Sequence, residues 1–203
     1  MIAIVDYGMG NVGSVRNALR FLGAEGIVTA HGADFEKASH IILPGVGAFP
    51  DGMRRLKSCP GFSDMEREVL VRGKPFLGIC LGMQFLATYG EEAGGAPGLG
   101  WIEGRVERLR VDEDAYRLPH IGWNEVAPIE SSILFKSVPS RHFYFVHSYV
   151  LRPNDPNIVV GTCAYGETFP VAVEKGNIFG TQFHPEKSQK GGLAVLKNFI
   201  SYA

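Results

Sequence analysis

The chain has 203 residues, and its 20 Lys and Arg against 21 Asp and Glu give a formal net charge of −1 at pH 7. This balance excludes the strongly basic face that nucleic-acid binding requires, and no apolar run approaches the ~20 residues that span a bilayer. We therefore expect neither a nucleic-acid nor a membrane partner. The length fits one domain, residues 1–203, that buries a sizeable core.

The three cysteines, Cys59, Cys80 and Cys163, are widely spaced. An odd count without regular spacing is not typical of a disulfide framework, and it favours a reducing, cytoplasmic location. The histidines and cysteines show no ligand spacing typical of a metal site. We expect neither a metal nor another cofactor.

In the first half of the chain, short apolar runs alternate with helical patterns. Strands are predicted at residues 2–6, 27–30, 40–43 and 75–79, and helices at 11–22, 48–56, 62–72 and 81–89. This alternation is typical of a parallel sheet with helices on its faces.

The second half is dominated by strand patterns after a glycine-rich loop at residues 90–100. Strands are predicted at 102–109, 121–126, 143–150, 159–164, 171–174 and 178–183, and a closing helix at 192–202. No linker, repeat or composition break divides the chain. The predicted fold is therefore a single α/β domain with an open, mixed, mainly parallel sheet flanked by helices.

Cys80 stands between Gly78 and Gly82, after an apolar strand and before a helical pattern. This is the nucleophile elbow with sulfur in place of the hydroxyl, a sharp turn that tolerates only small neighbours. A helix N-terminus favours thiolate, and the N–H of Leu81 can face a developing oxyanion. Most free cysteines are small buried hydrophobes, but the strand-before, helix-after context favours a catalytic role here.

A cysteine nucleophile needs a base, and His184 is the strongest candidate. It follows the strand predicted at 178–183 and precedes Pro185 and Glu186. Proline fixes the chain after the strand, and a carboxylate two residues beyond the histidine can hold the imidazole tautomer. Alone, the His-Pro-Glu sequence would be read as a surface loop. Together with the elbow it predicts a Cys80, His184, Glu186 triad.

Residues 78–84 and 182–188, Gly-Ile-Cys-Leu-Gly-Met-Gln and Gln-Phe-His-Pro-Glu-Lys-Ser, resemble the motif pair of the triad-type, class I glutamine amidotransferases. Within that family, residues 6–11, 43–49 and 118–124, together with 144–149, are similar to the glutaminase subunits of imidazole glycerol phosphate synthase. The resemblance extends from residue 2 to about residue 190.

The resemblance implies an activity and a partner. Cys80 would attack the side-chain amide of glutamine and form a thioester, with His184 as acid and base and Glu186 as its orienter. The ammonia would pass to a (β/α)8-barrel cyclase subunit, with which the chain would form a heterodimer in histidine biosynthesis. The joint products would be imidazole glycerol phosphate and an aminoimidazole carboxamide ribotide.

The resemblance also implies further site residues. The oxyanion hole would be formed by Leu81, Gly45 and Val46, and we hypothesise that the Gly45–Val46 peptide must reorient to complete it. The residues implied to bind glutamine are Gln84, Gly47, His147, Ser148 and Tyr149. Those implied to contact the cyclase are Met9, Asn11, Trp123, Tyr144 and Lys187.

Three alternatives remain. The chain could serve another glutamine-dependent synthase, such as those that make anthranilate, aminodeoxychorismate or GMP, although the His-Ile-Gly-Trp-Asn motif at 120–124 weighs against this. It could be a non-catalytic scaffold subunit, which would not need an intact triad. It could also be an elbow-cysteine peptidase or chaperone, which the Glu directly after His-Pro disfavours.

Overall fold

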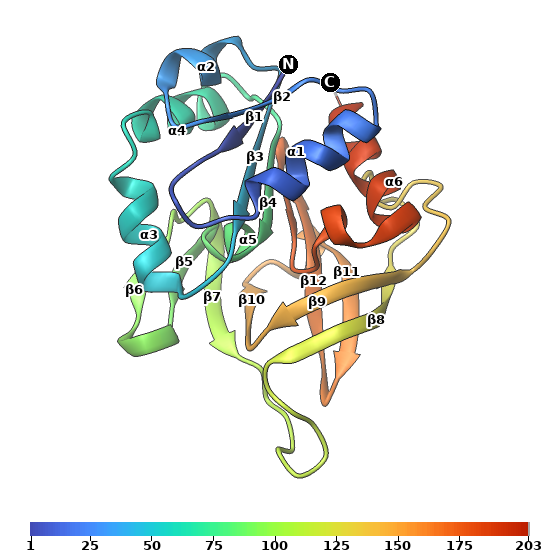
Figure 1. Ribbon diagram of the computed structural model, residues 1–203. Coiled ribbons are helices and arrows are strands. Elements are labelled where there is room, and N and C mark those ends of the chain that lie inside the picture. Colours follow the sequence, from blue (N-terminus) through green and yellow to red (C-terminus); the bar gives the residue numbers. More distant parts are fainter. Residues whose placement is uncertain (203) are drawn as a thin grey trace.

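The computed structural model describes residues 1–202 and contains two β-sheets with helices packed around them (Figure 1). The larger sheet has nine strands in the order β2-β1-β3-β4-β13-β12-β11-β8-β9. Its parallel half consists of β1 (Ile2–Val5), β2 (Gly26–Thr29), β3 (His40–Gly45), β4 (Phe76–Cys80) and β13 (Ile178–Thr181).

From β13 onward, each strand pairs antiparallel with the next. This half consists of β12 (Glu167–Lys175), β11 (Val159–Tyr165), β8 (His120–Pro128) and β9 (His142–His147). The smaller sheet has four strands in the order β10-β7-β5-β6, namely β10 (Tyr149–Pro153), β7 (Ile102–Arg108), β5 (Ala87–Gly90) and β6 (Ala96–Pro97).

The helices lie on both faces of the parallel half. On one face are α1 (Val12–Phe21) and α6 (Gln189–Ile200), and on the other are α2 (Gly32–Lys37), α3 (Phe49–Lys57) and α4 (Phe62–Leu70) (Figure 1). The remaining described elements are the short helix α5 (Leu81–Gln84) and three 3-10 turns: η1 (Glu92–Gly94), η2 (Pro156–Ile158) and η3 (Pro185–Lys187). Within residues 1–202, no helix is both long and apolar enough to cross a bilayer.

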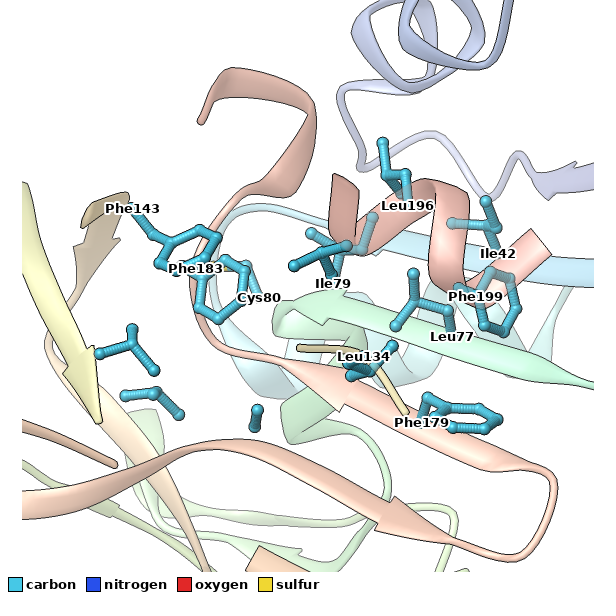
Figure 2. Close-up of a cluster of buried hydrophobic side chains, with 14 of the residues drawn as sticks. Ile42, Leu77, Ile79, Cys80, Leu134, Phe143, Phe179, Phe183, Leu196 and Phe199 are labelled. Atoms are coloured by element: carbon cyan, nitrogen blue, oxygen red, sulfur yellow. The ribbon is translucent and has the colours of Figure 1, made fainter. Parts of the chain in front are cut away.

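Alternation along the central strands builds two cores. In β1, Ile2 and Ile4 pack with α1 and α6, whereas Ala3 and Val5 pack into the cluster on the opposite face. Both faces are therefore apolar, as expected for strands covered by helices on either side. Figure 2 shows the α6 side, where β4 carries side chains of this core up to Cys80 at its end.

The structure agrees with the predicted helix-flanked mixed sheet but differs in three details. The strands form two sheets rather than one, and antiparallel pairing extends further than predicted. The helix predicted at 81–89 ends at Gln84, because the following segment enters β5 and pairs with β7. The strand predicted at 143–150 breaks at Ser148, which separates β9 and β10 into different sheets.

Two smaller differences occur in loops. Residues 32–37, for which no element was predicted, form α2, a single short helix that buries Phe35. The loop predicted at 90–100 contains η1 and β6, and β6 pairs with β5. All three elements are too short to produce a periodic apolar pattern, which explains why the sequence did not indicate them.

Candidate active site

The nucleophile elbow lies where β4 ends and α5 (Leu81–Gln84) begins. Cys80 itself adopts φ 55° and ψ −109°, a conformation that L-residues rarely take. Such backbone strain persists only where the surroundings impose it, and it occurs preferentially at functional sites. The predicted elbow is therefore present, with Cys80 at the strained position.

The glycines beside Cys80 are required by close packing. A Cβ on Gly82 would lie 1.9 Å from the carbonyl oxygen of Leu43, and one on Gly78 would lie 2.5 Å from the carbonyl oxygen of Gly82. Neither contact can be relieved by a side-chain rotation, because backbone atoms are on the other side. The predicted need for small neighbours is thus confirmed by the geometry.

The segment predicted to complete an oxyanion hole lies beside the elbow. Gly45 ends β3 and is the register partner of Cys80. A Cβ on Gly45 would lie 2.8 Å from both the Gly82 nitrogen and the Leu81 Cβ, so the two chains are in close contact. The next residue, Val46, is 41% exposed. The structure therefore brings Gly45, Val46 and Leu81 together around Cys80.

His184 and Glu186 are buried and hydrogen bonded to each other. The His184 Nδ1 and Glu186 Oε1 atoms are 2.9 Å apart, and the two side chains are only 2% and 1% exposed. Backbone contacts hold the histidine: its N–H donates to the Tyr144 carbonyl at 3.0 Å, and Ser188 Oγ donates to its carbonyl at 2.6 Å. The predicted orienter thus contacts the predicted base.

The electrostatic surroundings of His184 favour the imidazolium. Burial alone would lower the pKa of His184, but the charge of Cys80 and the hydrogen bond and charge of Glu186 outweigh it and raise the pKa to about 10. Within residues 1–202, His184 Nε2 is buried without a hydrogen-bond partner. A cationic imidazole with one uncommitted N–H can donate a proton to a leaving group.

A cavity of about 280 Å³ opens at the elbow. The predicted site residues that line it are Val46, Gly47, Cys80, Leu81, Gln84, His147, Ser148 and Tyr149. Glu92, Pro119 and Val146 also line it and were not predicted. Of these, Glu92 accepts from the Phe49 N–H at 2.7 Å, so its carboxylate ties the cavity wall to the start of α3.

Gln182 contacts Cys80 directly and was missing from the predicted site residues. Its Nε2 donates to the Cys80 sulfur at 3.6 Å, and its Oε1 accepts from Gln84 Nε2 at 3.2 Å. A donor facing the sulfur stabilises thiolate. The sequence carried no direct signal for this contact, because it arises from the pairing of β13 with β4, in which Gln182 follows Thr181, the partner of Ile79 beside the nucleophile.

His147 belongs to a second polar cluster on the cavity wall. Its Nδ1 is 3.1 Å from the Tyr149 carbonyl oxygen, and its Nε2 is 3.1 Å from His120 Nδ1. The same Tyr149 carbonyl accepts from Gln84 Nε2 at 2.9 Å. Burial, followed by the charges of His120 and His184, lowers the pKa of His147 to about 3. No role for His120 was predicted from the sequence.

The predicted cyclase contacts lie around Tyr144, in η3 and just before α1. Trp123, 48% exposed, lies edge-on to Tyr144, and Lys187 Nζ is 5.6 Å from the centre of the Tyr144 ring. The Met9 methyl lies 2.6 Å from the Cβ position of Gly47, and Asn11 caps α1 by accepting from the Ser14 N–H. Contact of these residues with a partner stays a prediction.

Comparison with known sequences points to one family. The sequence pattern of the family Glutamine amidotransferase class-I matches residues 3–202. Imidazole glycerol phosphate synthase subunit HisH 2 of Pseudomonas aeruginosa is 44% identical over 202 residues, covering 98% of both chains. Imidazole glycerol phosphate synthase subunit HisH of Moorella thermoacetica is 48% identical over 199 residues, covering 98% of this chain and 93% of its own.

Comparison with solved structures supports the fold. A glutamine amidotransferase crystal structure matches with a TM-score of 0.75 at 22% identity, covering 99% of this chain and 98% of its own. PurLQS from Thermotoga maritima matches with a TM-score of 0.74 at 19% identity, covering 99% and 97%. At these identities the likeness concerns the fold alone, and it confirms the predicted α/β class.

Proposed function

Because the chain belongs to the class I glutamine amidotransferase family and, within it, to the HisH subunits of imidazole glycerol phosphate synthase, we propose that Cys80, His184 and Glu186 hydrolyse glutamine to glutamate and ammonia. The family predicted from the motifs is thereby confirmed. The observation that carries the assignment of the triad is the buried 2.9 Å His184–Glu186 hydrogen bond beside a nucleophile held at positive φ.

In the first half-reaction, the Cys80 sulfur attacks the side-chain amide carbon of glutamine. A carbon–sulfur bond forms while the electron pair of the C=O bond moves to oxygen. When the carbonyl re-forms, the C–N bond breaks and His184 Nε2–H protonates the departing nitrogen, which leaves as ammonia. Glu186 stabilises the imidazolium and keeps the remaining proton on Nδ1.

In the second half-reaction, neutral His184 acts as base. Its Nε2 removes a proton from water as the oxygen attacks the thioester carbon. The carbon–sulfur bond then breaks, glutamate is released, and the starting Cys80–His184 pair is restored. One water is consumed and one ammonia is formed for each glutamine.

We propose that Leu81 and Val46 donate their N–H groups to the oxyanion, with Gly45 allowing the Gly45–Val46 peptide to reorient first. The positive φ of Gly47, +98°, and the exposure of Val46 support a segment that can turn over. A thioester structure in which the Val46 N–H points away from the oxyanion would contradict this step. Gln84, Gly47 and the segment 147–149 would hold the rest of the substrate.

The ammonia is passed to a cyclase partner in this proposal, as the HisH family membership implies. Trp123, Tyr144 and Lys187 would contact the cyclase, as would Met9 and Asn11. Tyr144 is suited to couple the two proteins, because its backbone carbonyl accepts from His184 while its ring contacts Lys187. We place the reaction in the cytoplasm, since the three cysteines are free thiols, and we treat residues 1–203 as one amidotransferase domain.

The test is glutamate production from glutamine by the chain, with and without a cyclase subunit and its ribotide ligand. We expect turnover that rises with the liganded cyclase and falls by at least about 10³-fold in Cys80→Ser. Cys59→Ser is the matched control, because that thiol lies outside the cavity, and it should keep full turnover.

Other outcomes would redirect the proposal. Strong turnover that ignores the cyclase would keep the glutaminase but assign the chain to a different synthase. Turnover that survives in Cys80→Ser would remove the nucleophile from the account. Absence of turnover under every condition would favour a scaffold subunit.

A further inference from the structure

We propose that His120 is a positioning residue for the glutamine site: with Asn124, it holds His147 in the one tautomer that donates a hydrogen bond to the Tyr149 carbonyl. This inference rests on the proposed function, because it concerns the cavity wall formed by residues 147–149. His120 does not line the cavity and would act only through His147.

The two histidines face each other across one strand pair. His120 begins β8 and is the register partner of His147 at the end of β9. They are 3% and 6% exposed. The His120 ring stacks between Phe145, at 4.9 Å, and Tyr165, at 4.1 Å between ring centres. Such packing leaves the ring little freedom to turn over.

The hydrogen bonds determine which nitrogen carries each proton. A carbonyl oxygen only accepts, so His147 Nδ1, 3.1 Å from the Tyr149 oxygen, must carry a hydrogen. In a neutral ring its Nε2 is then an acceptor. Because that atom lies 3.1 Å from His120 Nδ1, the hydrogen between the two rings must belong to His120.

Asn124 is the last member of this row of hydrogen bonds, on the side of His120 away from His147. With its proton on Nδ1, His120 presents Nε2 as an acceptor, and Asn124 Nδ2 lies 3.4 Å away. The orientation of the Asn124 amide is fixed from both ends: Nδ2 donates to the Ala164 carbonyl at 3.0 Å, and Oδ1 accepts from the Glu125 N–H at 2.8 Å. The hydrogen bonds therefore run in one direction: Asn124 donates to His120, His120 donates to His147, and His147 donates to the Tyr149 carbonyl.

The surroundings keep both rings neutral, as this chain of hydrogen bonds requires. Burial lowers the pKa of His120 to about 4. The pKa of His147 is lowered by burial first and then by the charges of His120 and His184. A proton added to either ring would place two N–H groups face to face, so the arrangement is stable only with one proton on each ring.

The consequence for the cavity is a fixed backbone on both sides of Tyr149. The Tyr149 carbonyl receives two donors, His147 Nδ1 and Gln84 Nε2. The preceding carbonyl, that of Ser148, accepts from the Leu109 N–H at 2.9 Å. Since Ser148 and Tyr149 line the cavity next to Cys80, the orientation of their peptides sets the shape of the proposed glutamine site.

Two substitutions at position 120 separate hydrogen bonding from packing. His120→Phe keeps an aromatic ring between Phe145 and Tyr165 but removes the donor to His147. His120→Asn loses the stacked ring but retains a side-chain NH₂ near the position of Nδ1. Both are assayed as complexes with the liganded cyclase, with kcat and KM for glutamine measured separately.

We expect His120→Phe to raise the KM for glutamine roughly fivefold, the effect of losing about one neutral hydrogen bond, while kcat changes less than about twofold. His120→Asn should keep a KM near the original value even if its thermal stability falls. An unchanged KM in His120→Phe would overturn the inference. So would a larger KM defect in His120→Asn, because packing would then be the cause.

A second readout does not depend on activity. In ¹⁵N spectra of the free chain, His147 should show a protonated Nδ1 and an unprotonated Nε2, and His120→Phe should shift this signal towards a mixture of tautomers. A His147 protonated at Nε2 in the original chain would overturn the inference even if glutamine turnover is normal. Conversely, a chain without turnover but with the expected spectrum would contradict the proposed function and leave the tautomer assignment standing.

Discussion

Two buried histidines of the same site, His184 and His147, are treated in opposite ways by their surroundings. Both are almost inaccessible to solvent, at 1% and 6% exposed. The pKa of His184 is raised to about 10, against the effect of burial, by Cys80 and Glu186. The pKa of His147 is lowered to about 3 by burial, His120 and His184. One histidine is therefore built as a cation and the other as a neutral ring.

The difference lies in the kind of partner rather than in the depth of burial. His184 faces groups that can carry negative charge, whereas His147 faces a carbonyl and another imidazole. Unpartnered buried atoms also separate the two regions. Within residues 1–202 they include His184 Nε2, Glu186 Oε2 and Tyr7 Oη, all on the Cys80 side, while both ring nitrogens of His147 are hydrogen bonded.

This contrast suggests that His184 and His147 have different roles in the site. Uncommitted polar atoms beside Cys80 are costly to bury, but one of them, His184 Nε2, is the atom that exchanges a proton with substrate in the proposed reaction. A fully hydrogen-bonded cluster rigidifies the structure around it, and the His147 cluster does so for the wall of the cavity. Reactivity and shape are thus assigned to two different histidines, His184 just before η3 and His147 at the end of β9.

The largest expected effect on activity comes from removing the negative charge beside His184, so that this histidine, like His147, has only neutral hydrogen-bond partners in its own segment. Glu186→Gln removes the carboxylate charge but keeps the side-chain size, so the imidazolium loses one of its stabilising partners. We expect kcat for glutamine to fall by about 10²- to 10⁴-fold, the usual range for loss of acid–base catalysis. In the original chain, activity should decline as pH rises through about 10, where His184 loses its proton. In Glu186→Gln this decline should move to lower pH.

The exposed Glu103 supplies the control for that experiment, since Glu103→Gln makes the same chemical change on the surface of β7. It should leave kcat and the pH profile as they are. An alkaline limit that does not move in Glu186→Gln would show that the carboxylate is not what holds the proton on His184.

The next effect concerns stability in acid. The pKa of His120 is lowered to about 4, so between pH 6.5 and pH 4 the unfolded chain binds a proton at this residue that the folded chain does not. Stability must therefore fall as pH falls through this window. We expect His120 to account for at most about 3 kcal/mol of that loss, at about 1.4 kcal/mol for each pH unit between the two pKa values. Urea unfolding at a series of pH values measures it.

His120→Phe removes this contribution while His147 and the carboxylates, which also affect stability in acid, are kept. Its unfolding free energy should depend less steeply on pH than that of the original chain between pH 6.5 and pH 4. If the unfolding free energies of the two proteins depend on pH in the same way, His120 is protonated in the folded state. The two rings would then not both be neutral, which contradicts the arrangement described here.

The smallest expected effect tests whether the unpartnered groups near Cys80 reduce stability. Tyr7 is buried, its hydroxyl has no hydrogen-bond partner within residues 1–202, and its ring packs edge-on to Phe85. Tyr7→Phe keeps the ring contact and removes the hydroxyl, so we expect a gain of about 1 kcal/mol in unfolding free energy. Chemical denaturation of both proteins decides it. A loss of stability would indicate that the hydroxyl has a partner, such as a bound water.

Much of this site could be predicted because its chemistry depends on local sequence. Gly78 is needed by a contact within the elbow itself, and Glu186 reaches His184 from two residues away. Both patterns are visible in a linear sequence. The apolar runs of β1, β3 and β4 likewise identify buried strands, because both of their faces are covered by helices.

What could not be predicted depends on register between distant strands. The His120–His147 contact arises from pairing of β8 with β9, and Gln182 meets Cys80 only because β13 lies beside β4. The break at Ser148 is similar: residues 143–150 read as one apolar strand, but the chain leaves one sheet and joins the other there. Periodicity within a segment carries no information about such partners.

The most direct test of the opposite charge states is a ¹⁵N-histidine titration of the chain, with signals assigned by single substitutions. We predict that His184 stays doubly protonated from neutral pH up to about pH 10, whereas His147 stays neutral until the pH approaches about 3. If instead both rings titrate near pH 6.5, as exposed histidines do, the two regions do not differ as described and the account of the site fails.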